Sequence, residues 1–198
     1  MKYGRLSPCL DRILIVASGP SAANLVIPES LPVIAVNGAI DGLARADYWF
    51  TLDPSPVNRH RMDNPKPGTS YLVASSPQMV SQAKGAHLTF LHRTPGRGIS
   101  TKPDSVMSGN SAFGALQVAV LLGAKRIGLV GVDATQDGYW HGPGQSRSLV
   151  NLPAMFSCAM PQLLRANIEV RLGTTYDRPR VTCFAPVHPT DLMEWLLR

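Results

Sequence analysis

The stretch SAFGALQVAVLLGAKRIGLVGVD, residues 111–133, decides the fold. Residues 111–124 are apolar or small over the length of a buried helix, and residues 126–133 are a short apolar run that ends in glycine and aspartate. A helix that leads straight into such a strand is typical of a parallel sheet with helices on both faces, because the strand has no solvent-exposed side. The stretch therefore predicts one unit of an α/β fold.

The same alternation runs through the rest of the chain. Further strands are predicted at residues 12–19, 32–38, 47–53, 70–75, 87–92 and 168–174. Further helices are predicted at residues 76–84, 152–166 and 191–198, with Pro161 as a residue that could kink or divide the second of them. The pattern predicts a Rossmann-like α/β fold: a mainly parallel sheet of about seven strands with helices on both faces.

Composition sets the outer bounds. A chain of 198 residues, 44% of them hydrophobic, suits one core, so residues 1–198 are expected to form a single nucleotide-binding domain. No apolar run approaches the roughly 20 residues that span a bilayer. The amino terminus lacks the apolar segment of a secretory signal, which predicts a cytoplasmic protein.

Positive charge exceeds negative charge, with a net charge of +6. It gathers at residues 58–66 and 92–102, which mix cations with Pro, Gly or Ser and are expected to be mobile loops. Such loops could be a solvated surface or a basic rim that attracts a nucleotide or a nucleic acid. Aromatic residues do not alternate with the cations, so a nucleic-acid partner is not favoured. The sequence is compatible with a homo-oligomer.

Polar residues at the strand ends are the site candidates, because ligands of such sheets bind beyond the carboxyl ends of the strands. Gly19 and Ser21 follow the first strand, where small residues let backbone N–H groups approach a phosphate, although glycine turns are also common punctuation. Asn37 and Asp53 end two further strands, and each could read a base or ribose or simply form a turn. Asp133 follows the strand at 126–133.

The segment SGNS, residues 108–111, runs into the long predicted helix. Ser108 or Asn110 can cap that helix, while Gly109 keeps the backbone accessible to an anion. A simple N-cap accounts for half of this pattern, and the alternative is an anion site.

The loop after Asp133 places Tyr139, Trp140 and His141 among glycines. We expect residues 134–144 to be a mobile flap over a bound nucleotide, because exposure would waste the large apolar area of Trp140. An imidazole with a pKa near 6.5 can take a proton from an attacking hydroxyl, which makes His141 the candidate general base. The alternative is a histidine in an ordinary surface loop.

Together these segments resemble a known superfamily. They are GPS at 19–21, the second-strand Asn37, DP at 53–54, residues 108–133 and the histidine loop that follows. The superfamily joins the bacterial sialyltransferases of the Campylobacter type, the motility-associated glycosyltransferase-like proteins and the archaeal 6-hydroxymethylpterin diphosphokinases. Residues 168–196 are similar to the tail of small phage-encoded members.

The resemblance implies a nucleotide site. The turn, the second-strand Asn and the third-strand polar residue would hold the nucleotide, the Ser-Gly loop would contact the nucleotide sugar, and Tyr139 would bind phosphate. The sialyltransferases have Asn where Asp53 stands, and their catalytic histidine lies farther along the chain than His141. The predicted nucleotide-binding set is Ser18, Gly19, Pro20, Ser21, Asn37, Asp53, Ser108, Gly109, Asn110, Ser111, Asp133 and Tyr139.

Three functions follow from these expectations. The first is glycosyl transfer, of the sialyl type, from a nucleotide sugar to a hydroxyl acceptor, with no tightly bound cofactor; amides near Gly19 and at 108–111 neutralise the leaving phosphate, and His141 is the base. The second is an ATP-dependent diphosphokinase in which Asp53 and Asp133 share Mg²⁺. The third is a phage protein that binds or sequesters a nucleotide without turnover. The acceptor is not identified.

Overall fold

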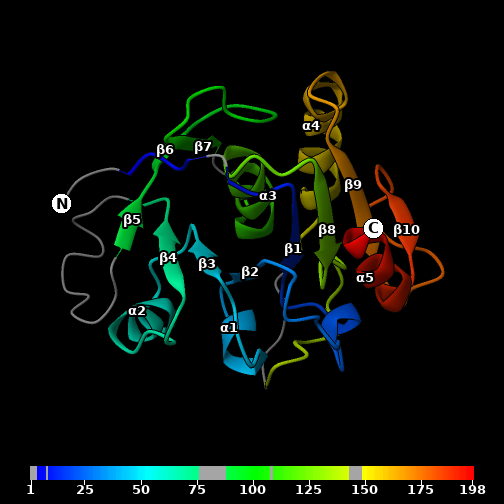
Figure 1. The fold of residues 1–198 in the computed structure, drawn as a ribbon, viewed down its shortest axis with the longest axis horizontal. Coiled ribbons are helices and arrows are strands. Elements are labelled where there is room, and N and C mark those ends of the chain that lie inside the picture. Colours follow the sequence, from blue (N-terminus) through cyan, green and yellow to red (C-terminus); the bar gives the residue numbers. More distant parts are fainter. Residues whose placement is uncertain (1–3, 8, 76–87, 108, 143–148) are drawn as a thin grey trace.

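A computed structural model describes residues 4–7, 9–75, 88–107, 109–142 and 149–198. Its centre is an eight-stranded sheet in the order β10-β9-β8-β1-β2-β3-β4-β5, and every neighbouring pair is parallel (Figure 1). The strands are β1 (Arg12–Val16), β2 (Val33–Val36), β3 (Tyr48–Thr51), β4 (Ser70–Val73), β5 (Leu88–Phe90), β8 (Arg126–Val130), β9 (Glu169–Gly173) and β10 (Ala185–Val187).

The predicted fold class is confirmed, and each of the seven predicted strands lies in this sheet. Three short strands were not predicted: β10 and a separate parallel pair, β6 (His92–Thr94) and β7 (Ser105–Met107). Each has three residues, and β6 (HRT) and β7 (SVM) contain polar residues that interrupt an apolar run, whereas β5 (LTF) continues on to Leu91. Pro186 further masks β10, and it is tolerated because this strand ends the sheet.

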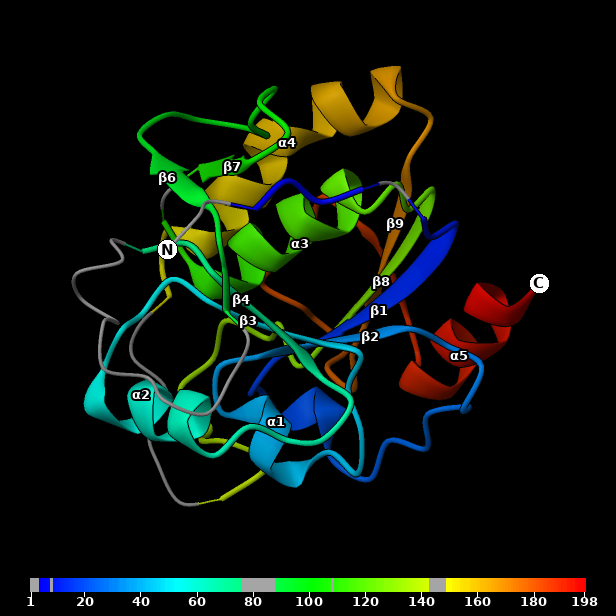
Figure 2. The same cartoon turned by 60° about the vertical axis from the view of Figure 1, so that its left-hand side comes forward.

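The helices cover both faces of the sheet (Figure 2). On one face lie α3 (Ser111–Leu121) and α4 (Leu152–Arg165), and on the other lie α1 (Ala39–Gly42), α2 (Pro56–Asp63) and α5 (Pro189–Leu197). A hydrophobic core lies on each face of the sheet, and alternate residues of β1 point into each of them. Ile13 and Ile15 pack with α3, whereas Leu14 and Val16 pack with α5. Because β1 is buried on both faces, it reads as a continuous apolar run.

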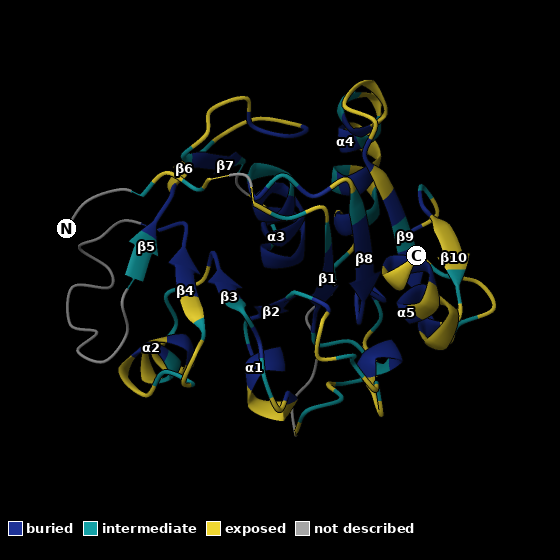
Figure 3. Ribbon diagram, in the orientation of Figure 1, coloured by how far each residue is buried: buried dark blue, intermediate teal, exposed yellow. Residues whose placement is uncertain are grey.

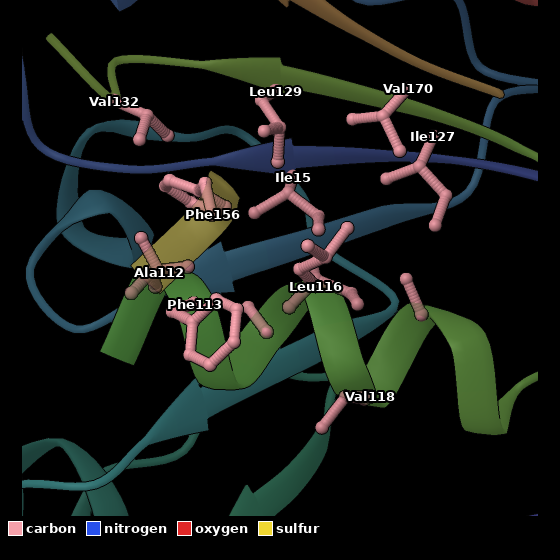
Figure 4. Close-up of a cluster of buried hydrophobic side chains, with 14 of the residues drawn as sticks. Ile15, Ala112, Phe113, Leu116, Val118, Ile127, Leu129, Val132, Phe156 and Val170 are labelled. Carbon is pink, nitrogen blue, oxygen red and sulfur yellow. The ribbon is translucent and has the colours of Figure 1, made fainter. Parts of the chain in front are cut away.

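The core under α3 joins three elements at close range (Figure 4). Phe113 and Leu116 of α3 face Ile15 of β1, and Phe156 of α4 meets Phe113 edge to face, with ring centroids 5.6 Å apart. The central strands and α3 are buried, while the outer sides of α2 and α5 are exposed (Figure 3). The long apolar helix is therefore held on the sheet directly behind the strand ends.

Several local expectations need correction. Residues 58–66, expected to be a mobile loop, lie largely in α2, which Ser55 caps by accepting a hydrogen bond from the amide of Asn58 (3.5 Å). The expected loop 92–102 begins as β6. Pro161 lies inside α4 without dividing it, and α5 begins two residues earlier than expected, at Pro189. The helix expected at 76–84 lies outside the described residues.

The strand order reverses between β1 and β8. From β1 the chain builds β2 to β5 to one side, and β8, β9 and β10 extend the sheet on the other side. The crevice beyond the carboxyl ends of β1 and β8 is therefore the switch point at which ligands of such sheets bind. No described helix is long and apolar enough to cross a membrane.

Candidate functional site

A cavity of about 450 Å³ lies at this switch point. Residues from the ends of β1, β2, β3 and β8 and from the start of α3 line it together. Among the residues predicted from sequence, those in its wall are Ser18, Gly19, Asn37, Asp53, Asn110, Ser111, Asp133 and Tyr139. Pro20, Ser21 and Gly109 lie outside its wall, and Ser108 lies outside the described residues.

A second cavity, also of about 450 Å³, adjoins the first. The two share a wall made of Ser18, Asn37, Asp53, Ser55 and Tyr139. From there the second cavity continues over α1 and α2 to Asp41, Asn58, Arg61 and His141. The predicted residues are thus divided between two neighbouring spaces, with His141 in the second.

The backbone amides of the first turn are already in use. The amide of Gly19 donates to the carbonyl oxygen of Gly131 (2.8 Å), and the amide of Ser21 donates to Oδ2 of Asp133 (2.9 Å). The next two amides donate to carbonyl oxygens within the turn itself. The amides of Gly19 and Ser21, which were expected to approach a phosphate, are therefore not free to do so in this geometry.

Asp133 is only 5% exposed and holds the first turn in place. Its Oδ2 accepts the Ser21 amide, and its Oδ1 is enclosed without a hydrogen-bond partner among the described residues. Burial raises the pKa of this carboxyl group, although hydrogen bonds from Ser21 oppose the shift. A carboxyl group that is enclosed, already bonded and biased toward its neutral form fits Mg²⁺ poorly.

The donor set around Asp53 does not fit a metal centre either. The described residues contain no cluster of three or more His, Cys, Asp or Glu side chains that could hold a metal ion. Asp53 itself is exposed, and its Oδ1 accepts the amide of Ser55 (3.1 Å). The side chain therefore helps to set the start of α2.

The start of α3 carries two of the predicted residues. Oδ1 of Asn110 accepts the amide of Ala112 (2.7 Å), which confirms the expected helix cap. Oγ of Ser111 accepts the amide of Leu52 (3.2 Å), and this bond ties the helix start to the end of β3. The N-terminal end of an eleven-residue helix thus faces the cavity, where its dipole favours an anion.

Gln117 was not predicted, although a lone amide in an apolar helix was a usable signal. It is fully buried, and its Oε1 accepts the amides of Ser100 (3.2 Å) and Met107 (2.8 Å). Its Nε2 donates to the carbonyl oxygen of Met107 (3.4 Å). Gln117 therefore holds the chain that leads into the start of α3.

The loop after β8 is anchored to the end of β1. Nε1 of Trp140 donates to the carbonyl oxygen of Ala17 (2.8 Å), and the Trp140 amide donates to that of Ser18 (3.2 Å). The indole is half-buried against the second core, in line with the expectation that it is sheltered. Asp137 accepts a hydrogen bond from the hydroxyl of Tyr176 (2.6 Å). Residues 143 and 144 of the expected flap lie outside the described residues.

His141 lies against α1. Its ring stacks on Tyr139 with centroids 5.4 Å apart, and a Cβ built on Gly38 would lie 2.5 Å from its Cε1. Gly42 makes similar room for Trp140, so these two glycines, which were not predicted, form the seat of the loop. Nε2 of His141 is enclosed and has no hydrogen-bond partner in the described part of the chain.

The electrostatics around His141 favour a neutral ring. Burial lowers the pKa of His141, while the nearby carboxylate of Asp41 opposes the shift. A neutral imidazole can accept a proton, but Nε2 can do so only after the ring turns away from Gly38. His141 can therefore act as the expected general base through Nε2 only if its ring first moves away from α1.

Arg61 is a further residue that sequence reasoning missed, because it fell in an expected loop. Its guanidinium binds both carboxylate oxygens of Asp41 (Nε–Oδ1 3.0 Å, Nη2–Oδ2 2.5 Å), which lowers the pKa of that carboxyl group. Its Nη1 donates to Oδ1 of Asn58 (2.6 Å). Arg61 and Asp41 thus form an ion pair in the wall of the second cavity.

No family model matches the sequence, and no curated protein matches it. The structure superposes on that of the MAf glycosyltransferase from Magnetospirillum magneticum AMB-1 with a TM-score of 0.62 at 13% identity. That match covers 98% of this chain but only 38% of the other, so the chain spans well under half of that protein. The likeness shows the fold.

The sialyltransferase CstII from Campylobacter jejuni is also similar. Its complex with the substrate analogue CMP-3FNeuAc superposes with a TM-score of 0.53 at 15% identity, covering 91% of this chain and 87% of that one. Its complex with cytidine-5'-monophosphate gives 0.51 at 13% identity, with 89% and 84% covered. The α/β architecture of this chain is therefore similar to that of these two proteins.

Proposed function

We propose that this chain binds a nucleotide in the switch-point cavity and transfers a glycosyl group from it to a hydroxyl acceptor. The observation that carries the proposal is the convergence of Gly19, Asn37, Asp53 and Asp133 on one cavity. Four strand ends far apart in sequence meet there, in a fold shared with glycosyltransferases. A volume of about 450 Å³ lies within the range of small-molecule sites, roughly 300–1,000 Å³.

The start of α3 is the part of this site suited to the leaving phosphate. Its helix dipole and the polar side chains of Asn110 and Ser111 lie in the cavity wall, whereas the amides of the first turn are taken. In the transfer, the acceptor oxygen forms a bond to the anomeric carbon as the bond from that carbon to the phosphate oxygen breaks. The nucleotide leaves with the electron pair and its phosphate charge.

The adjoining cavity is the place for the acceptor. It shares Asn37, Asp53 and Tyr139 with the nucleotide cavity and contains His141, so an acceptor there lies next to the donor. The proton of the acceptor hydroxyl passes to His141, which is neutral because burial lowers its pKa. In this proposal the imidazole turns from Gly38 when the acceptor binds.

A nucleotide screen tests the proposal. The apparent melting temperature of the protein is measured with CMP, UDP, GDP and ATP, each with Mg²⁺ and with a chelator, because a ligand of the native state raises it. We expect stabilisation by at least one nucleotide in the presence of chelator. Strict Mg²⁺ dependence would favour the diphosphokinase, and binding without release of nucleotide from any nucleotide sugar would favour a sequestering protein.

A substitution that adds a negative charge tests whether the nucleotide phosphate lies at the start of α3. Asn110→Asp keeps the helix cap but adds a negative charge beside the expected phosphate, so nucleotide affinity should fall about tenfold or more. Asn24→Asp is the matched control, because Asn24 is exposed and lies outside both cavities. Equal effects of the two substitutions would move the phosphate away from α3.

A further inference from the structure

Asn37 lies in the wall that the two cavities share, and its side-chain oxygen is fully engaged below them. Oδ1 accepts from the hydroxyl of Thr51 (2.6 Å) and from Nδ2 of Asn58 (3.4 Å). Its Nδ2 donates to no residue in the part of the chain that the structure describes. The carboxamide therefore turns its oxygen to the protein and its NH₂ group to the cavity.

Two buried side chains set this orientation. Thr51 is fully buried, and its hydroxyl oxygen accepts the amide of Asp53 (2.9 Å) and Nδ2 of Asn58 (3.1 Å). With those two bonds accepted, its single proton goes to the nearer acceptor, which is Oδ1 of Asn37 at 2.6 Å rather than the carbonyl oxygen of Asp53 at 3.1 Å. If the Asn37 amide flipped, its NH₂ group would face the hydroxyl proton of Thr51 and the NH₂ group of Asn58.

Asn58 in turn is oriented by Arg61. Oδ1 of Asn58 accepts Nη1 of Arg61 (2.6 Å), and a guanidinium has donors only, so the Asn58 oxygen must face it. The Asn58 NH₂ group then faces the other way. Its two hydrogens go to the carbonyl oxygen of Asp53 (2.9 Å) and to Oγ1 of Thr51 (3.1 Å), and Oδ1 of Asn37 is a longer, shared contact at 3.4 Å. Arg61 is itself held by Asp41.

Arg61 therefore fixes the orientation of the Asn58 amide, and the Asn58 amide in turn favours one orientation of the Asn37 amide. We propose that Asn58, oriented by Arg61, is a positioning residue that makes Asn37 a pure hydrogen-bond donor toward the cavity, so that the site selects ligands with an acceptor at this point. The acceptor class is a phosphoryl or carbonyl oxygen or an unprotonated ring nitrogen. That the ligand is a nucleotide rests on the proposed function, whereas the amide orientation does not.

The isosteric variant Asn58→Asp tests this proposal. It replaces the NH₂ donor by an acceptor and keeps an acceptor for Arg61, whose charge compensates the new carboxylate. Asn37 should then turn its NH₂ group inward and present oxygen to the cavity. Affinity for the nucleotide that best stabilises the wild-type protein should fall about tenfold or more.

A double-mutant cycle separates positioning from general damage. Asn37→Gly removes the carboxamide and suits the backbone there, because Asn37 has a φ of 50°. Once the carboxamide is gone, Asn58→Asp should cost only the affinity that depends on its bond to the carbonyl oxygen of Asp53, so its loss should be clearly smaller than in the wild-type background. Additive losses of affinity would overturn the proposal.

Hydrogen exchange measured without ligand tests the orientation of the Asn37 amide separately from nucleotide binding. In ¹H–¹⁵N spectra, the Asn37 NH₂ resonance, identified by its loss in Asn37→Gly, should exchange quickly with water in the wild-type protein. It should become protected in Asn58→Asp and stay unchanged in the control Asn64→Asp, which makes the same substitution at the end of the same helix. Unchanged exchange in Asn58→Asp would overturn the amide orientation. If the exchange is as expected but the protein binds no nucleotide, the proposed function is overturned and the amide orientation stands.

Discussion

Gly19 and Asp133 are in direct contact at the switch point of the sheet: a Cβ built on Gly19 would overlap Oδ2 of Asp133. It would also lie 2.7 Å from the carbonyl oxygen of Gly131. The close approach lets the Gly19 amide bond that carbonyl and lets Asp133 reach the amide of Ser21. Glycine is required here by the space between two strand ends, since its φ of −72° is open to any residue.

Gly19→Ala should therefore destabilise the protein. The added methyl group meets backbone atoms as well as a side chain, and overpacking of this kind costs about 1–3 kcal/mol. Urea unfolding measures the loss. Gly68→Ala is the control, because its methyl group enters open space and carries only the strain of a φ of 75°, about 1 kcal/mol. A smaller loss at Gly19 than at Gly68 would contradict the packing argument.

Trp140→Phe should loosen the loop that follows β8. The substitution keeps an aromatic ring in the seat but leaves the carbonyl oxygen of Ala17 without the indole N–H, at a cost of about 1–2 kcal/mol. Hydrogen exchange of residues 134–142 should become faster. Trp195→Phe is the comparison, because Trp195 lies on α5 rather than in the loop after β8, and its ring contacts the guanidinium of Arg171. Equal exchange of the loop in both variants would mean that the indole bond does not anchor it.

Gln117→Leu should disconnect the segment before α3. The amides of Ser100 and Met107 lose their shared acceptor inside the protein, which costs about 2–4 kcal/mol. Nucleotide affinity should fall as well, because Met107 leads directly to the residues at the start of α3. Gln117→Glu keeps the acceptor and should retain more affinity than Gln117→Leu. Unfolding and calorimetric titration of both variants check this order.

His141 should make stability depend on pH. Its folded pKa is lowered below the unfolded value of about 6.5, so the unfolded chain takes up a proton first as the pH falls. The stabilisation that comes from keeping this ring neutral is complete above about pH 6.5 and is lost as the pH falls through the lowered pKa. Unfolding free energies at about pH 7.5 and pH 5 should therefore differ less in His141→Gln than in the wild-type protein.

The exposed His60 on α2 provides the control for that pH dependence. The difference between the two pH values should shrink more in His141→Gln than in His60→Gln. If His141→Gln keeps the whole difference, its ring is not held neutral by burial against α1.

The sheet, and the edge at which its polar strand ends gather, could be predicted from the amino-acid sequence alone. Apolar runs such as residues 12–16 and 126–130 must be buried on both faces, which is a local property that their composition carries. Polar residues that follow such runs, among them Asn37 after β2 and Asp133 after β8, had to lie at one edge of a parallel sheet. The cavity of polar strand ends follows from that rule.

The hydrogen-bond partners of these polar groups depend on the packing of distant segments. Ser21 and Asp133 are 112 residues apart, and their hydrogen bond uses amide and carboxylate groups that the sequence left available for a ligand. The direction of the Asn37 carboxamide depends on Arg61 through Asn58, and the seat of His141 depends on Gly38. The reason is physical: composition reports whether a segment is buried, whereas hydrogen-bond partners are chosen by which elements packing brings within 3 Å or so of each other.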